Sequence, residues 1–354
     1  MTYEEIICDA NNLYKAYKAS VKCSKWKEST QRFMMNFLNY IFDIQEDLSN
    51  RTLTNGPVKE FSISERGRLR SIQRERFEVH LQKYYRKYGN EGYILFGDFT
   101  KFYDNIIHEL AKKELLRLFD NDEFIDWLLT LIFDSFKVDV SYMSDDEYSS
   151  CLYDTFNKLD YRKIPKNLLT GEKWMAKSVN IGDQLSQVIG IYYPYRIDNY
   201  VKYVRSQKFY GRYMDDWYIM SPSKEELEDL LKNIRKIAFD YGIHVNEKKT
   251  RIVKISSTYK FLQVKYTLTD SGKIIRRINP ERVTAMRRKL KKMSVKVKAG
   301  EIPEEYLENM FRSWMGAFYK IMSKQQRKNL ILLYEDLLNK NITIMNKKLI
   351  ISDK

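Results

Sequence analysis

The sequence predicts an α+β fold with an antiparallel sheet in the middle of the chain and a helical C-terminal part. Short apolar strand patterns at 93–99 and 208–221 are separated by helical patterns, and more strand patterns follow at 244–278. From Pro280 onward the apolar spacing is helical only. This order of strand, helices, hairpin, helix and strands is that of a split βαβ sheet. We expect helices to cover one face of this sheet.

The N-terminal part predicts helices and one hairpin. Helical patterns cover 3–19 and 27–48. The segments VKEFSI and RLRSI flank a turn-forming Glu-Arg-Gly at 65–67, so a β-hairpin is expected there. A basic, aromatic helix is expected over 74–88, where Gly89 ends it.

The rest of the chain predicts further helices around the strands. Two are expected over 104–136 and one over 183–205, whereas 140–178 has no regular pattern. Ser223 and Glu226 form a capping-box pattern that begins an amphipathic helix ending near Gly242. The C-terminal helices are expected over 280–298, 303–320 and 323–341.

The composition favours a nucleic-acid partner. Sixty-two basic residues against 47 acidic ones give a net charge of +15, which concentrates polyanions, although a charge that serves solubility alone is the alternative. Three cysteines without a CxxC pair and three scattered histidines argue against a zinc ribbon and favour a reducing, cytoplasmic environment. No signal peptide and no apolar run of the roughly 18 residues of a membrane span are present, so we expect a soluble protein.

The strongest chemical signal is Asp215-Asp216, which follows Tyr213-Met between two apolar strands. Adjacent aspartates are common in turns for conformational reasons alone. Here the apolar flanks predict a turn at the edge of a buried sheet, where two hard carboxylates suit Mg²⁺. Asp98, which closes the strand YILFG, is the candidate partner, with a strand-end or N-cap aspartate as the alternative. Together they predict a two-metal site, whereas Asp104 is expected to cap the next helix.

Five segments resemble the motifs of reverse transcriptases, in the same order. Asp98–Tyr103 (DFTKFY), Ile181–Gln187 (IGDQLSQ) and Tyr213–Asp216 (YMDD) resemble the three core palm motifs. Gly242–Thr250 (GIHVNEKKT) resembles the motif after the palm helix, and Phe261–Tyr266 (FLQVKY) resembles the primer-grip hairpin.

The basic helix from about 282 and the segment Ser313–Gly316 resemble the thumb of bacterial enzymes, and the resemblance covers about 27–320. It implies a right-hand polymerase fold and an RNA-directed DNA polymerase that uses deoxynucleoside triphosphates and Mg²⁺, with Mn²⁺ as an alternative. The implied domains are N-terminal helices with shortened fingers over 1–92, a palm with the antiparallel sheet over 93–278 and a helical thumb over 279–345.

The resemblance also assigns roles. Asp98, Asp215 and Asp216 would be the metal ligands and catalytic acids. Tyr103, five residues after Asp98, would be the steric gate that excludes a ribose 2′-hydroxyl, although in a chain with 27 tyrosines a core tyrosine is the alternative. Lys249 would protonate the pyrophosphate, whereas outside the family a solvated lysine is the alternative.

Further substrate contacts follow from the same likeness. Gly182 and Ser186 would let the backbone approach the nucleotide and template. Arg70 would clamp the triphosphate with its planar fork. Phe99 and Gln187 complete the expected substrate-binding set.

The second palm motif departs from the usual Gln-Gly…Ser-Pro form, with Ile181 at its first position and Gln187 at its last. This form resembles the reverse transcriptases of diversity-generating retroelements and of other bacterial groups. Because isoleucine has no amide to steady the incoming nucleotide, loose base selection is expected. An antiphage-defence enzyme that makes templated or untemplated DNA is the alternative.

Between Arg70 and Asp98 one helix stands where the family has a longer fingers segment, so a weakly active palm protein that binds structured RNA is a rival interpretation. The basic run of the predicted thumb helix meets only one acid, Glu281, and favours contact with the backbone of an RNA–DNA hybrid over an ordinary solvated face. A small basic accessory protein is a further candidate partner, and no membrane contact is expected. The thumb residues selected for nucleic-acid binding are Arg287, Arg288, Lys291 and Lys292.

Overall fold

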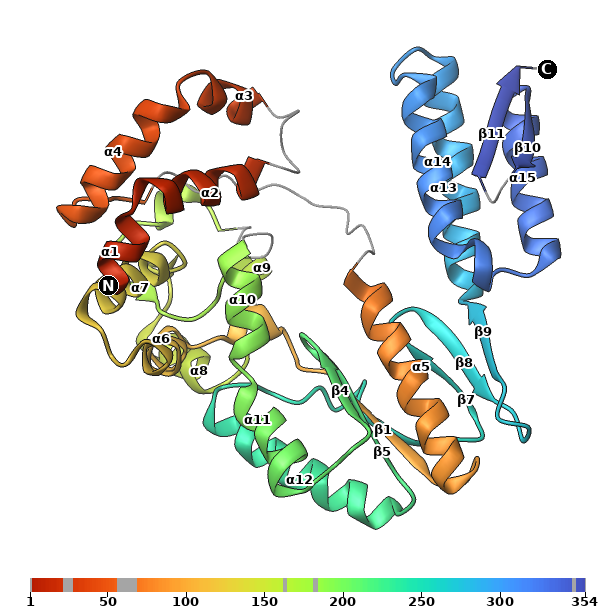
Figure 1. Cartoon of the computed structure of the whole chain (residues 1–354), viewed down its shortest axis with the longest axis horizontal. Helices are drawn as coiled ribbons and strands as arrows, with labels where there is room; N and C mark the ends of the chain where they lie inside the picture. The colour runs from red at the N-terminus through yellow and green to blue at the C-terminus, as the bar shows by residue number, and fades with distance from the viewer. Residues whose placement is uncertain are drawn as a thin grey trace. The chain divides into compact units, whose positions relative to one another are not determined.

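The chain folds into two units, each built from several stretches of sequence (Figure 1). The computed structural model describes residues 2–21, 28–55, 69–161, 164–180, 184–345 and 348–353. The first unit comprises 1–64, 99–197 and 234–245, and the second comprises 65–98, 198–233 and 246–354. Within the described ranges, no helix is both long and apolar enough to cross a membrane.

The first unit begins with helices α1 (Tyr3–Cys8), α2 (Ala10–Val21), α3 (Glu28–Met35) and α4 (Phe37–Ser49). Each of the two helices expected here is therefore divided in two. Extended backbone at Asp9 (ψ 127°) ends α1, and Asn36, with a φ of −133°, separates α3 from α4.

Two helices follow in the region 104–136, as predicted. They are α6 (His108–Leu116) and α7 (Glu123–Asp134), with 3-10 turns η1 (Phe102–Asn105) and η2 (Arg117–Phe119) before and between them. One core joins α1, α4 and α7 through Cys8, Leu48, Phe124 and Ile125.

The segment 140–178, for which the sequence predicts no regular pattern, has a defined structure. After β2 (Val138–Asp139), it contains α8 (Asp145–Tyr153), α9 (Lys158–Tyr161), η3 (Lys166–Leu168) and β3 (Trp174–Met175). Ser144 and Glu147 form a full capping box, which explains where α8 begins. At the other end, the buried Lys177 ammonium donates to the carbonyls of Cys151, Leu152 and Asp154 at 2.8–3.3 Å.

The prediction of a single helix over 183–205 is wrong. The chain forms α10 (Gln184–Tyr192), α11 (Tyr195–Asn199) and a π-helical turn, η4 (Tyr200–Val204). Pro194 separates α10 from α11 because proline has no backbone N–H to continue the helix.

The second unit is built on the sheet β4-β5-β1-β6, in which every neighbouring pair is antiparallel. Its strands are β1 (Tyr93–Gly97), β4 (Tyr210–Tyr213), β5 (Asp216–Ser221) and β6 (Arg251–Lys254). Because β5 lies between β1 and β4, the predicted split βαβ arrangement is confirmed. β1 and β5 are buried almost throughout, so both faces of the sheet are covered and the expectation of one backed face is wrong.

Helix α12 (Lys224–Asp240) connects β5 to β6 and begins where the capping pattern predicts. The Glu226 amide N–H donates to Ser223 Oγ at 3.0 Å. The Glu226 carboxylate accepts hydrogen bonds from Gln207 and Ser221 instead of returning to Ser223. Only half of the capping box therefore forms.

Helix α5 (Leu69–Tyr88) covers the sheet face that carries Ile94 and Phe96. Its residues Phe77, Leu81 and Tyr84 recur at helical spacing, are fully buried and belong to the same core. The prediction of a β-hairpin is wrong over Leu69–Ile72, because these residues form the first turn of α5. The remainder of that hairpin lies outside the described residues.

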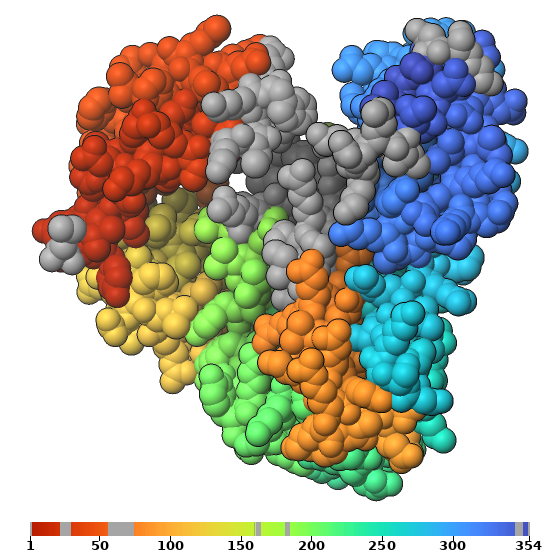
Figure 2. Space-filling model, turned by 45° about the vertical axis from the view of Figure 1, so that its right-hand side comes forward, coloured from red at the N-terminus to blue at the C-terminus, as the bar shows by residue number. Residues whose placement is uncertain are grey.

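A separate antiparallel sheet is formed by β7 (Thr258–Phe261), β8 (Val264–Leu268) and β9 (Ile274–Ile278). It packs beside α5, and Figure 2 shows the surfaces of this sheet and of α5 next to each other. Leu262 and Gln263 turn β7 into β8 with φ of 43° and 73°, and positive φ at both central residues is what a type I′ hairpin turn requires. The strand expected over 244–255 is reduced to β6, because a turn occupies 247–249.

The C-terminal helices α13 (Pro280–Lys298), α14 (Glu304–Phe318) and α15 (Lys324–Leu338) agree with the predicted helices. The expectation of an all-helical C-terminus is wrong, because a hairpin of β10 (Lys340–Met345) and β11 (Lys348–Asp353) follows. Asn339, with a left-handed φ of 55°, ends α15. The β-branched run Ile342-Thr343-Ile344 then favours a strand. The buried core here includes Leu290, Leu307, Phe311, Met315, Leu330 and Tyr334.

Candidate active site

Asp98 follows the last residue of β1 and is almost completely buried, with 5% of its surface exposed. Its backbone carbonyl accepts a hydrogen bond from the Asn246 amide N–H at 2.8 Å, and its Oδ2 accepts one from Asn246 Nδ2 at 3.2 Å. Lys249 Nζ lies 2.9 Å from the same Oδ2. The carboxylate therefore faces polar side chains from the segment after α12, and the next helical turn, η1, has Lys101 rather than Asp98 at its N-cap.

Strands β1 and β5 lie side by side (Figure 1), and their register brings Asp98 toward the YMDD turn. Gly97 is paired with Trp217, and one further step along this register places Asp98 opposite Asp216. A Cβ at position 97 would lie only 2.0 Å from the Trp217 ring, so the close approach of the two strands at this end requires glycine.

Asp215 lies in a two-residue turn. Tyr213 pairs with Asp216 across the β4–β5 hairpin, which leaves Met214 and Asp215 between the strands. Met214 has a φ of 54°, in the left-handed region that non-glycine residues seldom adopt. The turn thus holds one aspartate at its tip and the other at the start of β5.

Lys249 interacts electrostatically with all three carboxylates. Its hydrogen bond to Asp98 raises the pKa of its ammonium, partial burial lowers it, and the negative charges of Asp98, Asp215 and Asp216 raise it further. The side chain is nevertheless 64% exposed. The amide N–H of Lys249 donates to Asn246 Oδ1 at 3.2 Å, which orders the turn that presents the side chain.

The same carboxylates fit a divalent cation by charge and by donor type, since carboxylate oxygens are the ligands that Mg²⁺ prefers. Among the described residues no group of three acidic, histidine or cysteine side chains is arranged closely enough to hold a metal as it stands. The Lys249 ammonium is the cation that Asp98, Asp215 and Asp216 share in this arrangement. Metal binding would require the two turn carboxylates and Asp98 to close around the ion.

Residues 27–266 match the family model described as reverse transcriptase (RNA-dependent DNA polymerase), which covers more than half of the chain. The chain belongs to the reverse transcriptase family. Its fold is accordingly the right-hand polymerase fold, in which the β4-β5-β1-β6 sheet is the palm. A comparison with curated proteins gives no match.

Solved structures similar to this reverse transcriptase include two telomerases. Telomerase from Candida albicans, in complex with a fragment of telomeric RNA, is 16% identical with a TM-score of 0.39, over 76% of this chain and 49% of that one. Apo telomerase from Candida tropicalis is 16% identical with a TM-score of 0.36, over 56% of this chain and 35% of that one. The chain thus spans about half, or less, of the length of these telomerases.

Tyr103 of the reverse transcriptase lies in η1 with its ring half-buried. Its backbone carbonyl accepts a hydrogen bond from the Val179 amide N–H at 2.9 Å. Its ring lies against Gly190 of α10, where a Cβ would stand 3.0 Å from the Tyr103 Cε1 and Oη atoms. No local sequence signal singles out Gly190, because contact between η1 and α10 is a tertiary property.

The second palm motif is only partly described. Ile181 and Gly182 lie outside the described residues. Ser186 is fully buried in α10, and its hydroxyl has no hydrogen-bond partner among the residues that are described. Gln187 is half-buried on the same helix. This motif and Tyr103 belong to the first unit, whereas Asp98, Asp215, Asp216 and Lys249 belong to the second.

Two further predicted substrate contacts are Phe99, which forms an isolated β-bridge with Val245, and Arg70. The Phe99 side chain is buried, with 1% exposed, and its ring lies 5.7 Å from that of Phe102. A contact between Phe99 and a nucleotide would therefore come from its backbone. Arg70 lies in the first turn of α5, and its side chain is outside the described part of the structure.

The residues predicted to bind nucleic acid are all exposed on α13. They are Arg287, Arg288, Lys291 and Lys292. The one acid of this helix, Glu281, accepts a hydrogen bond from Asn279 at its N-terminus. The exposed basic face of α13 is therefore not neutralised by acids of the same helix.

Sequence reasoning missed two side chains at the site, Asn246 and Arg212. Asn246 lies within the predicted GIHVNEKKT motif and contacts Asp98, whereas Arg212 directly precedes YMDD. The only signal available was position, within a motif for Asn246 and next to one for Arg212.

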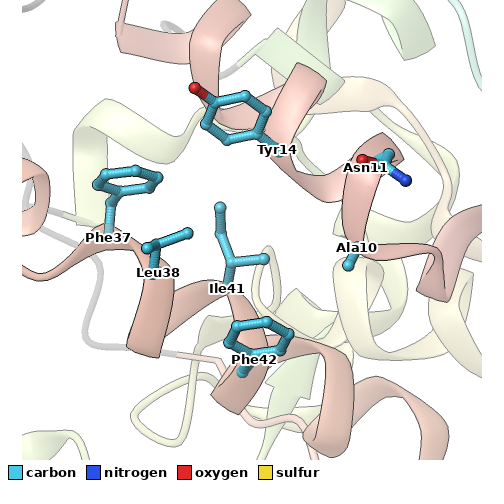
Figure 3. Close-up of a pocket in the computed structure, with 7 residues that line it drawn as sticks. All are labelled: Ala10, Asn11, Tyr14, Phe37, Leu38, Ile41 and Phe42. Atoms are coloured by element: carbon cyan, nitrogen blue, oxygen red, sulfur yellow. The ribbon is translucent and has the colours of Figure 1, made fainter.

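Two hollows in the described surface are lined by other residues. One of about 270 Å³ lies between α2 and α4 (Figure 3). A second, of about 490 Å³, is lined by residues of α2, α3 and α4. Neither contains a predicted site residue. The first is lined by Ala10, Asn11, Tyr14, Phe37, Leu38, Ile41 and Phe42.

Proposed function

We propose that this reverse transcriptase is an active RNA-directed DNA polymerase, a nucleotidyltransferase whose metal ligands are Asp98, Asp215 and Asp216. The supporting observation is that the β1–β5 register sets Asp98 opposite Asp216 while one ammonium, that of Lys249, interacts with all three carboxylates. Once they close around the ion, three carboxylates at the ends of neighbouring strands would bind Mg²⁺, with Mn²⁺ as an alternative.

Two bound divalent ions would activate the attacking 3′-hydroxyl and stabilise the leaving pyrophosphate. The protein's own contribution is to fix the carboxylates through the short strands and the two-residue turn. Lys249 is the proposed proton donor to the pyrophosphate. Its side chain is exposed and its pKa is raised, so the ammonium is protonated at neutral pH.

The proposed substrates are deoxynucleoside triphosphates on an RNA template. Tyr103 is the proposed steric gate, with its backbone held by Val179 and its ring beside Gly190. Arg70 is the proposed triphosphate clamp, and Gly182, Ser186, Gln187 and Phe99 complete the nucleotide site. The proposed contacts to the phosphates of the template–product hybrid are four exposed cations of α13: Arg287, Arg288, Lys291 and Lys292.

The proposed biological setting is a diversity-generating retroelement, supported by Ile181 and Gln187 in the second palm motif. A small basic protein is the proposed accessory partner. The second candidate, a weakly active palm that binds structured RNA, is favoured by the single helix α5 between Arg70 and Asp98. An antiphage-defence role is the remaining alternative for an active enzyme.

The test is primer extension by Asp215→Asn on an RNA template. A metal acting as Lewis acid contributes several kcal/mol to the barrier, so we expect incorporation to fall by about 10³-fold or more. RNA affinity should stay close to that of the wild type, because the basic surface is unchanged. The matched control is Asp240→Asn, the same charge change at the exposed end of α12. Equal incorporation by the two variants would contradict the proposed site, and no incorporation by the wild type would favour the RNA-binding alternative.

A further inference from the structure

A buried cation lies beside the YMDD turn and has no part in the chemistry proposed above. Arg212, on β4, has only 7% of its side chain exposed, and its partner Asp198, in α11, has 23%. Arg212 Nε donates to Asp198 Oδ1 at 2.9 Å, and Nη2 donates to Oδ2 at 2.6 Å. The pair is therefore bidentate, the geometry that fixes a guanidinium in one orientation.

The third nitrogen of Arg212 reaches the turn itself. Nη1 donates to the Met214 carbonyl at 3.2 Å. Met214 is the left-handed residue directly before Asp215, and this conformation is strained for a non-glycine residue. The hydrogen bond offsets part of this strain and holds the peptide that leads into Asp215.

Asp198 is fixed from another side as well. The Tyr210 hydroxyl donates to Asp198 Oδ1, the oxygen that also accepts from Arg212 Nε. Burial, together with the Asp198 charge, holds the pKa of Tyr210 well above its ordinary value, so the hydroxyl remains a donor at any physiological pH. Tyr210 and Arg212 are both on β4, so the strand that leads into the turn is tied to α11 at two points.

We propose that Arg212 is a positioning residue, which Asp198 orients and which holds the Met214 carbonyl so that Asp215 and Asp216 keep the geometry that metal binding needs. This inference rests on the proposed function, because the carboxylates it positions are the proposed metal ligands. Lysine would keep the charge but has no planar fork, so it could not bind Asp198 through two nitrogens and the turn through a third.

The experiment compares Arg212→Lys with Arg205→Lys in the full chain. Arg205 is a matched control because it also binds an aspartate, Asp229 Oδ2 at 2.5 Å, and a tyrosine hydroxyl, Tyr200 Oη at 3.0 Å. Its side chain is more exposed, at 28%, and that of Asp229 is exposed at 53%. The hydrogen bonds of Arg205 do not reach the YMDD turn.

Two readouts are needed. In primer extension, Arg212→Lys should lower kcat by about 10²-fold, the effect of a misplacement near 1 Å, and raise the Mg²⁺ concentration for half-maximal rate. KM for the nucleotide and hybrid affinity should change less than twofold, and Arg205→Lys should match the wild type throughout. Independently of activity, Mn²⁺ binding followed by electron paramagnetic resonance should be weakened several-fold in Arg212→Lys alone.

The inference and the proposed function fail in different ways. Wild-type protein that binds Mn²⁺ but incorporates nothing would contradict the function, whereas identical Mn²⁺ binding and kcat in both lysine variants would overturn the role of Arg212. If Arg212→Lys does not fold, Asp198→Asn, which keeps one carbonyl oxygen for the guanidinium, provides the same two readouts. A folded Asp198→Asn protein with wild-type Mn²⁺ affinity and Mg²⁺ dependence would likewise overturn it.

Discussion

At the scale of single residues, two glycines make room for aromatic rings at the proposed active site. Gly97 lets the Trp217 ring cross the end of β1, and Gly190 lets the Tyr103 ring lie against α10. At neither position does a positive φ require glycine, so the reason for glycine is the space beside it. The Gly190 contact is looser than that at Gly97, and the ring can therefore respond to an added methyl group by moving.

We predict that Gly190→Ala lowers kcat/KM for deoxynucleotides by about 3- to 10-fold. The added Cβ would stand 3.0 Å from the Tyr103 ring, so the ring must shift by a few tenths of an ångström. That is less than the 1 Å misplacement that costs about 10²-fold. The measurement is steady-state incorporation of deoxynucleotides and ribonucleotides by the wild type and the variant.

The same substitution made in a Tyr103→Ala protein tests whether the ring carries the effect. With no ring at position 103, Gly190→Ala should change neither kcat/KM nor the discrimination against ribonucleotides. The control is Gly316→Ala in α14, a helical glycine with nothing within 4 Å of its added Cβ. A loss in the Tyr103→Ala background as large as in the wild type would show that Gly190 acts through helix α10 itself.

At the scale of elements, a buried carboxylate connects α6 to α11 and to the residue after α12. Glu114 of α6 is 4% exposed. Its Oε1 accepts from Arg196 Nη2 at 2.8 Å and from the Tyr241 hydroxyl at 2.7 Å, and its Oε2 accepts from the Tyr195 hydroxyl at 2.7 Å. Burial acts to raise the pKa of Glu114, but these hydrogen bonds outweigh it and lower the pKa to about 2.

This pKa shift predicts an acid-sensitive contribution to stability. Because the folded pKa of Glu114 lies below the ordinary 4.5, its stabilisation is present above about pH 4.5 and is lost as the pH falls toward 2. Glu114→Gln should lower the free energy of unfolding by about 2–3 kcal/mol at pH 7, and the difference should shrink at pH 3.

Urea unfolding at several pH values measures the Glu114 effect. Glu109→Gln, an exposed glutamate in the first turn of the same helix, should cost less than about 1 kcal/mol. A Glu114→Gln deficit that stays constant from pH 7 to pH 3 would mean that packing, and not the charged hydrogen bonds, accounts for it.

At the scale of the whole molecule, the net charge of +15 is concentrated in part on the exposed face of α13. Each phosphate that a cation neutralises releases condensed counterions, so log affinity falls with log salt by about 0.7–0.9 per contact. Hybrid binding should therefore be strongly salt-dependent if α13 contacts the backbone. A solvated helix face would contribute little to either affinity or slope.

Replacing Arg287, Arg288, Lys291 and Lys292 by alanine should weaken hybrid binding for all sequences alike and reduce the salt slope by roughly two to four. Binding titrations at several salt concentrations give both quantities. Lys232→Ala with Lys236→Ala, on the exposed face of α12, is the control and should reduce the slope by less than about one. An unchanged slope in the α13 variant would assign its charges to solvation.

The elements that the sequence determined are those with a strong local period or a turn signal. The strands β1, β4 and β5, the helix α12 after Ser223 and the three C-terminal helices were predicted because apolar spacing and capping are local. Among the described residues, the predictions failed at Leu69–Ile72, which begin helix α5 instead of forming a strand, and after α15, where the strand signal is short and comes late in the chain.

For the proposed site, the sequence by itself identified Asp98, Asp215, Asp216 and Lys249, because carboxylates at strand ends and a lysine within a motif are visible without a structure. Only the tertiary structure decided that Lys249 contacts Asp98 across 151 residues, that Gly190 faces Tyr103 and that Arg212 holds the turn. The physical reason is the sequence separation over which each interaction acts. Local spacing decides which residues form a strand or a helix, whereas side-chain partners depend on strand register and helix packing, which bring together residues far apart in the chain.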